Sequence, residues 1–285
     1  MLNIYPSAGR PAPGAAPVWI DLLSPTPQES ADITARFGVQ VPSRESLQEI
    51  ETSSRTRAEG QVLYVSMPLT VQDAAAGLAP LPLGFVLSAQ LLLTVRFSEV
   101  HSFAKAVTYV NTDPHPSGPA VFCALIDSMV DFSADTLEKL STDLASVSTR
   151  VFVSRGTRSN YDRRFARVLR QSLVEVGTAG DHLSRNRESL LGLQRIVSFV
   201  SEMAAEWLPA ELKLRLKTAR QDLTSLVDFE SHLSGKTQFL LDAVLGFIST
   251  EQNDVFKILT IVSVVGVPPT LIASMYGMNF HYMPE

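Results

Sequence analysis

The sequence predicts an α/β domain at the N-terminus, followed by long α-helices and a C-terminal transmembrane helix. Up to about residue 112, runs rich in β-branched and aromatic residues alternate with capped helical segments. Beyond that point, apolar residues recur at spacings of three and four with little interruption, as in helices. The last of these patterns runs into residues 258–284, which contain no Asp, Glu, Lys or Arg.

The first region carries signals for individual elements. Residues 18–22 have the composition of a strand. Thr26 and Glu29 have the spacing of a capping box around a proline, so a helix is expected at residues 27–37. A second short helix is expected at residues 42–50.

Further strands are predicted at residues 62–70, 85–88 and 91–97. The run Ala-Pro-Leu-Pro at residues 79–82 is rich in turn-forming residues and is expected to break the chain between the first two of them. Ser98 is expected to cap the helix that follows.

Composition divides the chain into six segments. The predicted segments are a cytosolic α/β domain (1–112), a linker (113–119), a cytosolic helical region (120–209), a stalk helix (210–256), a transmembrane helix (257–280) and the start of an extracytoplasmic loop (281–285).

The last helix is expected to run from about Glu211 to Tyr276 as one element about 100 Å long. Its apolar stripe consists of Leu223, Leu226, Val227, Leu233, Leu240, Val244 and Ile248. A helix of that length needs neighbours, and a stripe shared between subunits, as in a coiled coil, is the simplest support.

Composition also narrows the classes of function. The 285 residues carry a formal net charge of −5 without a dominant basic patch, so a nucleic-acid partner is not expected. Residues 1–17 lack the basic flank and apolar core of a signal peptide, so the N-terminal body is expected in the cytosol.

The single cysteine, Cys123, excludes an intramolecular disulfide. The many arginines between Arg163 and Arg220 form either solvated helix faces or a cationic surface near a membrane or an acidic partner.

Residues 258–280 are interpreted as a membrane span. As a helix they would cover about 35 Å, enough to cross a hydrocarbon core of about 30 Å. The alternative is a buried helix of a soluble domain, which would be shorter and polar on one face.

Pro268 and Pro269 remove backbone donors in mid-span and should bend the helix. Bilayers tolerate this where a neighbouring helix or a water-filled cavity meets the freed carbonyls, which favours an oligomer with a pore.

Motifs at both ends of the chain resemble those of CorA-type magnesium transporters. The C-terminal motifs are Asn-Asp-Val-Phe-Lys-Ile-Leu-Thr (253–260), Pro-Thr (269–270), Tyr-Gly-Met-Asn-Phe (276–280) and Met-Pro-Glu (283–285). The N-terminal motifs are Trp-Ile-Asp-Leu (19–22), Pro-Ser-Arg-Glu (42–45), Glu-Ile-Glu-Thr-Ser-Ser-Arg (49–55) and Leu-Thr-Val-Arg-Phe (93–97). The signature Gly-Met-Asn stands at the exit of a span, which makes the resemblance specific.

The resemblance implies a funnel-shaped homopentamer in a bacterial inner membrane, with the N-terminal domain in the cytoplasm. Mg²⁺ would be both the transported and the regulatory ion, and no organic cofactor is implied. Gly277, Met278 and Asn279 would form the outer mouth of the pore. Mg²⁺ gives up its water reluctantly, so Asn279 side chains and Gly277 carbonyls would hold the hydrated ion with neutral oxygen atoms.

The family pattern also implies roles below the mouth. The pore-facing positions match a stripe formed by Asn253, Phe256, Leu259, Ser263, Val267 and Thr270. Phe256 and Leu259 would form an apolar constriction that gates by dewetting, although helix packing alone would also explain the stripe. Lys257 would belong to a basic collar or anchor the helix at the membrane surface. Charge and location alone suggest four candidates for a regulatory cation site: Asp222, Asp228, Glu230 and Asp242.

Several alternatives stay open at this point. The sequence ends at Glu285, before the second membrane helix of the family, so either a truncation or a subunit without that helix is expected. Zinc, cobalt or nickel are alternative ions within the same superfamily. A membrane-anchored helical scaffold would leave the Tyr-Gly-Met-Asn-Phe segment without a purpose. A hydrolytic enzyme is not expected, because the sequence shows neither a phosphate-binding Gly-rich loop nor a nucleophile-elbow pattern.

Overall fold

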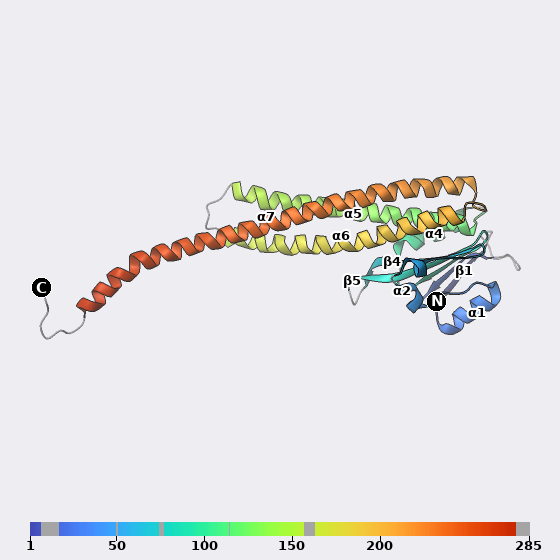
Figure 1. Cartoon of the computed structure of the whole chain (residues 1–285), viewed down its shortest axis with the longest axis horizontal. Helices are drawn as coiled ribbons and strands as arrows, with labels where there is room; N and C mark the ends of the chain where they lie inside the picture. Colours follow the sequence, from blue (N-terminus) through green and yellow to red (C-terminus); the bar gives the residue numbers. More distant parts are fainter. Residues whose placement is uncertain (7–16, 50, 74–76, 114, 157–162, 278–285) are drawn as a thin grey trace. The chain divides into compact units, whose positions relative to one another are not determined.

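The computed structural model describes residues 1–6, 17–49, 51–73, 77–113, 115–156 and 163–277 (Figure 1). Two compact units make up the chain. The first consists of Met1–Ser141 and Asp181–Ser234, and the second consists of Thr142–Gly180 and Gly235–Glu285. The first unit contains the sheet, and the second is built from helical segments.

One sheet of six strands forms the centre of the first unit. The strands are β1 (Leu2–Pro6), β2 (Pro17–Leu23), β3 (Thr56–Glu59), β4 (Val62–Asp73), β5 (Gly77–Leu87) and β6 (Leu92–Arg96). Their order in the sheet is β1-β2-β6-β5-β4-β3. The β2 and β6 strands pair in parallel, and the other neighbours pair antiparallel. Each predicted strand lies within or closely overlaps one of these elements.

The predicted break at residues 79–82 is wrong, because these residues lie inside β5. The β5 strand pairs with β4 along its whole length but with β6 only over residues 84–87. Among the described residues, no strand pairs with the other side of residues 77–83, and a proline at such an edge removes no ladder hydrogen bond. Two prolines, Pro80 and Pro82, are accommodated there for this reason.

Helix α1 (Pro27–Phe37) begins and ends as its sequence predicts. The Thr26 hydroxyl accepts a bond from the Glu29 amide at 3.2 Å, and the Glu29 carboxylate accepts one from the Thr26 amide at 2.8 Å. Gly38 follows the helix with a φ of 67°, the left-handed conformation that favours glycine. The short helices α2 (Arg44–Gln48) and α3 (Thr52–Arg55) come next, while residue 50 lies outside the described residues.

Helix α4 (His101–Thr112) starts two residues later than a Ser98 cap would require, so that prediction is wrong. Its N-cap is Val100, which makes no side-chain capping bond. The Ser98 carbonyl instead accepts a bond from the Arg96 guanidinium at 3.0 Å. Arg96 thus binds the bend that follows β6, and the helix begins beyond it.

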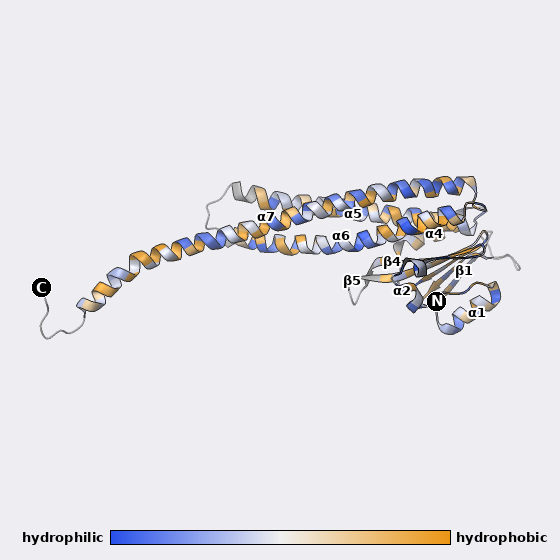
Figure 2. Cartoon of the chain, in the orientation of Figure 1, coloured by the Kyte–Doolittle hydropathy of each residue, from blue (hydrophilic) through white to orange (hydrophobic). Residues whose placement is uncertain are grey.

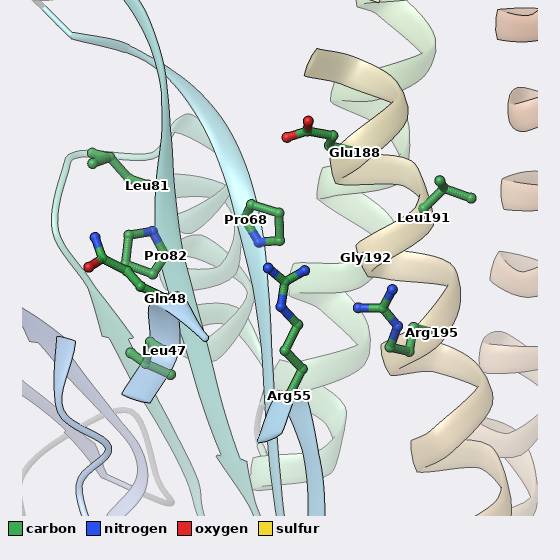
Figure 3. A pocket seen from close by; sticks show the side chains of 10 residues that line it. All are labelled: Leu47, Gln48, Arg55, Pro68, Leu81, Pro82, Glu188, Leu191, Gly192 and Arg195. Carbon is green, nitrogen blue, oxygen red and sulfur yellow. The ribbon is translucent and has the colours of Figure 1, made fainter. Parts of the chain in front are cut away.

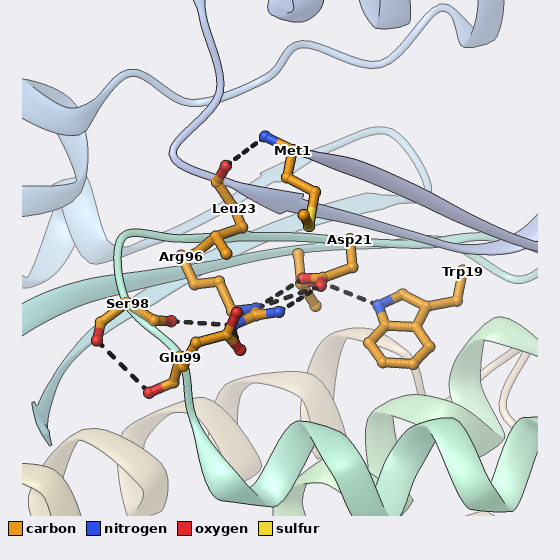
Figure 4. A network of polar contacts seen from close by, with 8 residues as sticks. Met1, Trp19, Asp21, Leu23, Arg96, Ser98 and Glu99 are labelled. Atoms are coloured by element: carbon orange, nitrogen blue, oxygen red, sulfur yellow. Dashed lines mark hydrogen bonds and ion pairs between the residues drawn. The ribbon is translucent and has the colours of Figure 1, made fainter.

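A buried polar network joins the parallel strands β2 and β6 (Figure 4). The Asp21 carboxylate accepts bonds from the Arg96 guanidinium at 2.8 to 3.2 Å and from the Thr94 hydroxyl at 2.8 Å. The Trp19 indole donates to Thr94 at 3.1 Å. Arg96 also lies over the Phe103 ring, 4.7 Å from its centroid, which connects the network to α4. The charges of Asp21 and Arg96 are therefore paired where water does not reach them.

The two faces of the sheet are covered by different helices. On one face, apolar side chains of the sheet pack with Ile33 of α1, with Val39 between the helices and with Leu47 of α2. The sheet residues in this cluster are Ile20, Leu22, Val86, Leu93 and Val95. On the other face, Phe85 meets Phe122 edge to face, with ring centroids 5.6 Å apart, and Met67 lies against Gly192. Phe122 and Gly192 belong to the long helices α5 (Gly118–Gly156) and α6 (Arg163–Met203). The first unit thus has the sheet between two helical layers.

Helix α7 (Ala210–Tyr276) is continuous over 67 residues, which confirms the predicted single helix. Part of its apolar stripe is buried within the chain, while Leu226, Val227 and Ile248 are half-buried. Leu223 and Leu233 are buried in the first unit, and Leu240 and Val244 are buried in the second. Support for this part of α7 therefore comes at least from α5 and α6 of the same chain, whereas a contact with a second subunit stays a prediction. Within the first unit, two ion pairs also hold α7: Arg215 pairs with Asp127 of α5, and Glu230 pairs with Arg187 of α6.

Gly118, at the start of α5, is predicted to tolerate no side chain. A Cβ atom there would lie 2.6 Å from backbone atoms of Leu91 and Leu92, which cannot move independently of β6. We expect Gly118→Ala to lower the free energy of unfolding by about 2 kcal/mol, as overpacking does. The matched substitution Gly177→Ala adds a methyl group where nothing lies within 4 Å, and it should stabilise α6 by about 0.5 kcal/mol. Thermal unfolding of the detergent-solubilised variants measures both effects, and equal destabilisation by the two would contradict this account.

Candidate ion pathway

The C-terminal part of α7 is the one described helix that is long and apolar enough to cross a membrane. None of its apolar window is buried within the chain. Figure 2 shows apolar residues predominating in this part of the helix, whereas the earlier part alternates between polar and apolar. In water such a surface would be strongly unfavourable, so the helix requires another apolar environment.

The helix runs through Pro268 and Pro269 without interruption and ends at Tyr276. From Ile258 to Tyr276 it covers about 28 Å, close to the thickness of a hydrocarbon core. The prolines carry no amide hydrogen, so the carbonyls of Val264 and Val265 lose their helical donors. Figure 1 shows that α7 curves toward its C-terminal end.

All six residues of the expected pore stripe are exposed in the single chain. The exposed fractions are 64% for Phe256 and 60% for both Leu259 and Val267. None of the six is therefore used to pack α7 against the rest of the chain. Their spacing places them on one face of a continuous helix, where they are available to lipid or to other chains.

Two hydroxyl groups in this stripe are oriented by the helix backbone. Ser263 donates to the Leu259 carbonyl and Thr270 donates to the Gly266 carbonyl, both at 2.8 Å. Because the hydroxyl hydrogen points back along the helix, each oxygen keeps its lone pairs for an outside donor. Water molecules around a cation direct their hydrogens outward, so such acceptors suit a hydrated ion.

Lys257 lies at the start of the apolar segment and is paired with an acidic residue. Its ammonium group donates to the Asp254 carboxylate at 3.2 Å. The ammonium side chain is largely exposed, as a basic collar or an interfacial anchor requires. Sequence reasoning missed Asp254 as its partner, although a spacing of three residues on a predicted helix was the available signal.

Gly277 follows the last turn of α7, and its amide donates to the Ala273 carbonyl at 2.9 Å. A Cβ atom at this position would lie 3.1 Å from the same carbonyl oxygen, a tight contact. Met278 and Asn279, the other residues of the expected mouth, lie outside the described residues.

The four candidate carboxylates of the stalk do not form one site in the single chain. Glu230 is buried, and its carboxylate accepts bonds from Arg187 and from the Ser234 hydroxyl. Asp222, Asp228 and Asp242 are exposed, and Asp242 accepts a bond from Gln238 at 3.1 Å. Among the described residues, no three His, Cys, Asp or Glu side chains come together as metal ligands.

Cys123 lies in the core of α5 and offers no ligand either. Burial raises the pKa of its thiol to about 12, so the thiolate that would bind a metal is not formed at neutral pH.

Comparisons with known proteins found a matching family, similar sequences and similar structures. A family described as "CorA-like Mg2+ transporter protein" matches residues 14–285. The magnesium transport protein CorA of Escherichia coli (strain K12) is 30% identical over 270 residues, which are 94% of this chain and 82% of that protein. The complete CorA magnesium transporter of Methanocaldococcus jannaschii superposes with a TM-score of 0.70 at 18% identity, covering 93% of this chain and 81% of that one. The full-length CmaX protein superposes with a TM-score of 0.72 at 14% identity, covering 100% and 89%.

Glu230 and Asp228 provide a test of whether the stalk carboxylates share one role. Removal of the buried Glu230 carboxylate by Glu230→Ala leaves Arg187 and Ser234 without their acceptor, and we expect a loss of about 2 kcal/mol of unfolding free energy. Asp228→Ala removes an exposed charge from the same helix and should change stability by less than about 0.5 kcal/mol. Denaturant unfolding in detergent compares the two. A Glu230→Ala protein as stable as Asp228→Ala would show that the Arg187–Glu230 pair has no structural role.

Proposed function

Because this chain belongs to the family of CorA-like Mg²⁺ transporter proteins, we propose that it carries Mg²⁺ across a membrane. The observation that carries this proposal is the C-terminal part of α7, which is apolar and unburied and has the hydroxyls of Ser263 and Thr270 on one face. The relative in Escherichia coli is a magnesium transport protein matched over most of this chain. The family is one of transporters, so the proposed function is passage of an ion and not a chemical reaction.

We propose that the functional assembly is a homopentamer in a bacterial inner membrane, with the α/β unit in the cytoplasm. One α7 helix cannot enclose a water-filled path, whereas a ring of copies can turn the stripe inward and the remaining apolar surface toward lipid. Lys257 at the N-terminal side of the span supports a cytoplasmic position for the body of the chain.

Neutral oxygen acceptors in the stripe suit an ion that keeps its water shell. Asn253, Ser263 and Thr270 supply side-chain oxygens along the path, and Gly277, Met278 and Asn279 are proposed to form its outer mouth. Phe256 and Leu259 form the proposed apolar gate near the cytoplasmic end. A neutral path conducts because it does not trap the ion, and a membrane potential of 100 mV supplies about 2.3 kcal/mol per charge.

We also propose that cytosolic Mg²⁺ regulates the path through carboxylates on the stalk. The exposed residues Asp222, Asp228 and Asp242 are the candidates, and ligands from a second copy would complete the site. Glu230 is a weaker candidate, because its carboxylate already accepts bonds from Arg187 and Ser234.

Ion flux into proteoliposomes tests the proposed function directly. We expect Mg²⁺ entry by the pentameric protein, extended by its natural downstream sequence where one exists, and loss of that entry in Asn279→Ala because the acceptors at the mouth are removed. Gln252→Ala removes an exposed amide one residue before the stripe and should leave entry unchanged. Entry should be at least about tenfold lower for Asn279→Ala than for Gln252→Ala, a barrier increase of about 1.4 kcal/mol.

The same assay separates the alternatives. Zn²⁺ entry without Mg²⁺ entry would assign the protein to zinc transport. Absence of flux for every divalent ion, in a folded and pentameric protein, would overturn the transporter proposal in favour of a membrane-anchored scaffold.

The proposed gate leads to a second prediction, in which the Mg²⁺ flux rises instead of falling. Phe256→Ala removes the largest side chain of the proposed constriction, so water should fill it and Mg²⁺ flux at high internal Mg²⁺ should rise by about tenfold. Val255→Ala shortens a neighbouring exposed side chain outside the stripe and should leave the flux unchanged. Equal flux in the two variants would place the gate elsewhere.

A further inference from the structure

A pocket with a volume of about 480 Å³ lies in the first unit between the sheet and α6 (Figure 3). Apolar side chains form much of its wall: Leu47, Pro68, Leu81, Pro82 and Leu191. Two arginines, Arg55 of α3 and Arg195 of α6, also line it. The volume is within the range of sites that hold small organic molecules.

The two guanidinium groups face the same space. Figure 3 shows them turned toward each other, with the Glu188 carboxylate at the far end of the pocket. Arg55 uses its Nε atom to donate to the Glu49 carbonyl at 2.7 Å. The Nη1 atom of Arg195 is buried and has no hydrogen-bond partner. Among the described residues, neither arginine forms an ion pair with Glu188.

This arrangement is unfavourable without an anion. Burial and the neighbouring charge of Arg195 lower the pKa of Arg55, and the charges of Glu188 and Glu51 offset this only in part, so Arg55 remains charged at neutral pH. A buried guanidinium hydrogen without an acceptor costs further free energy. An oxyanion between the two groups would supply acceptors to both arginines and relieve their repulsion, because guanidinium groups bind carboxylate and phosphate in a bidentate manner.

We propose that this pocket binds a small organic anion, with its carboxylate or phosphate between Arg55 and Arg195 and its apolar body against the leucine and proline wall. The pocket is too large for an oxyanion alone, and its wall offers contact to carbon atoms. A divalent cation is excluded as the occupant by the two positive charges. The site consists of residues in the cytosolic body and does not depend on the proposed transport function.

Binding to the full-length protein in detergent tests the proposal by isothermal titration with four probes: phenyl phosphate, benzoate, inorganic phosphate and uncharged phenol. We expect saturable binding of phenyl phosphate or benzoate, weaker binding of inorganic phosphate and none of phenol. Arg195→Gln should weaken binding by at least about tenfold, because a charged hydrogen-bond pair is lost. Arg170→Gln removes an exposed arginine from the same helix with the same change of net charge, and it should alter binding less than about twofold.

Two further readouts keep the test decisive if an arginine variant folds poorly. Glu188→Gln removes the one acidic side chain that lines the pocket, so it should tighten binding by about threefold. Without ligand, Arg195→Gln should melt at the same or a higher temperature than the wild type, since a repulsion is removed, whereas a structural arginine would melt lower. Absence of saturable binding by the wild type, or equal binding by Arg195→Gln and Arg170→Gln, would overturn the proposal. Inorganic phosphate binding as tightly as phenyl phosphate would overturn the apolar-body part of it.

Discussion

The unburied apolar surface at the end of α7 is the constraint on which the rest of the molecule depends. Each buried square ångström of such a surface is worth about 25 cal/mol, so the helix is stable only where lipid or protein covers it. Lipid suits most of the circumference, but it offers no donor to the oxygen atoms of Ser263 and Thr270. The proposed assembly meets both requirements by turning the stripe toward other copies of α7 around a shared water-filled path.

The remainder of α7 must then be held by the chain itself. Leu223 and Leu233 are buried in the first unit, and the carboxylate of Glu230 pairs with Arg187 of α6 there. In the second unit, Phe152 stacks on Phe239 and meets Phe247 edge to face, with ring centroids 5.9 and 5.8 Å apart. A helix supported in this way transmits a displacement along its axis, because a packed core deforms little. The sheet-bearing first unit and the apolar end of α7 are thus connected by one continuous helix.

Local signals predicted much of this fold, and the failures came from contacts between distant residues. The capping box at Thr26, the stop at Gly38 and the continuity of α7 depend on neighbouring residues and were predictable. The open edge beside Pro80 depends on how far β6 extends, which only the sheet reveals. In the candidate ion pathway, helical periodicity was enough to predict the stripe. The burial of Glu230, and the convergence of Arg55 and Arg195 in the pocket, could be seen only in the tertiary structure.

The placement of the stalk carboxylates has a consequence for regulation. No three potential ligands converge within the described part of one chain, and Asp222, Asp228 and Asp242 all face outward. A hard cation needs several oxygens at once, so a complete site would arise only where two copies meet. Bound there, the ion shifts the conformational equilibrium only to the extent that it binds one arrangement of the copies more tightly than another. The proposed regulation by cytosolic Mg²⁺ and the proposed assembly of the pore would then share the same contact between neighbouring stalks.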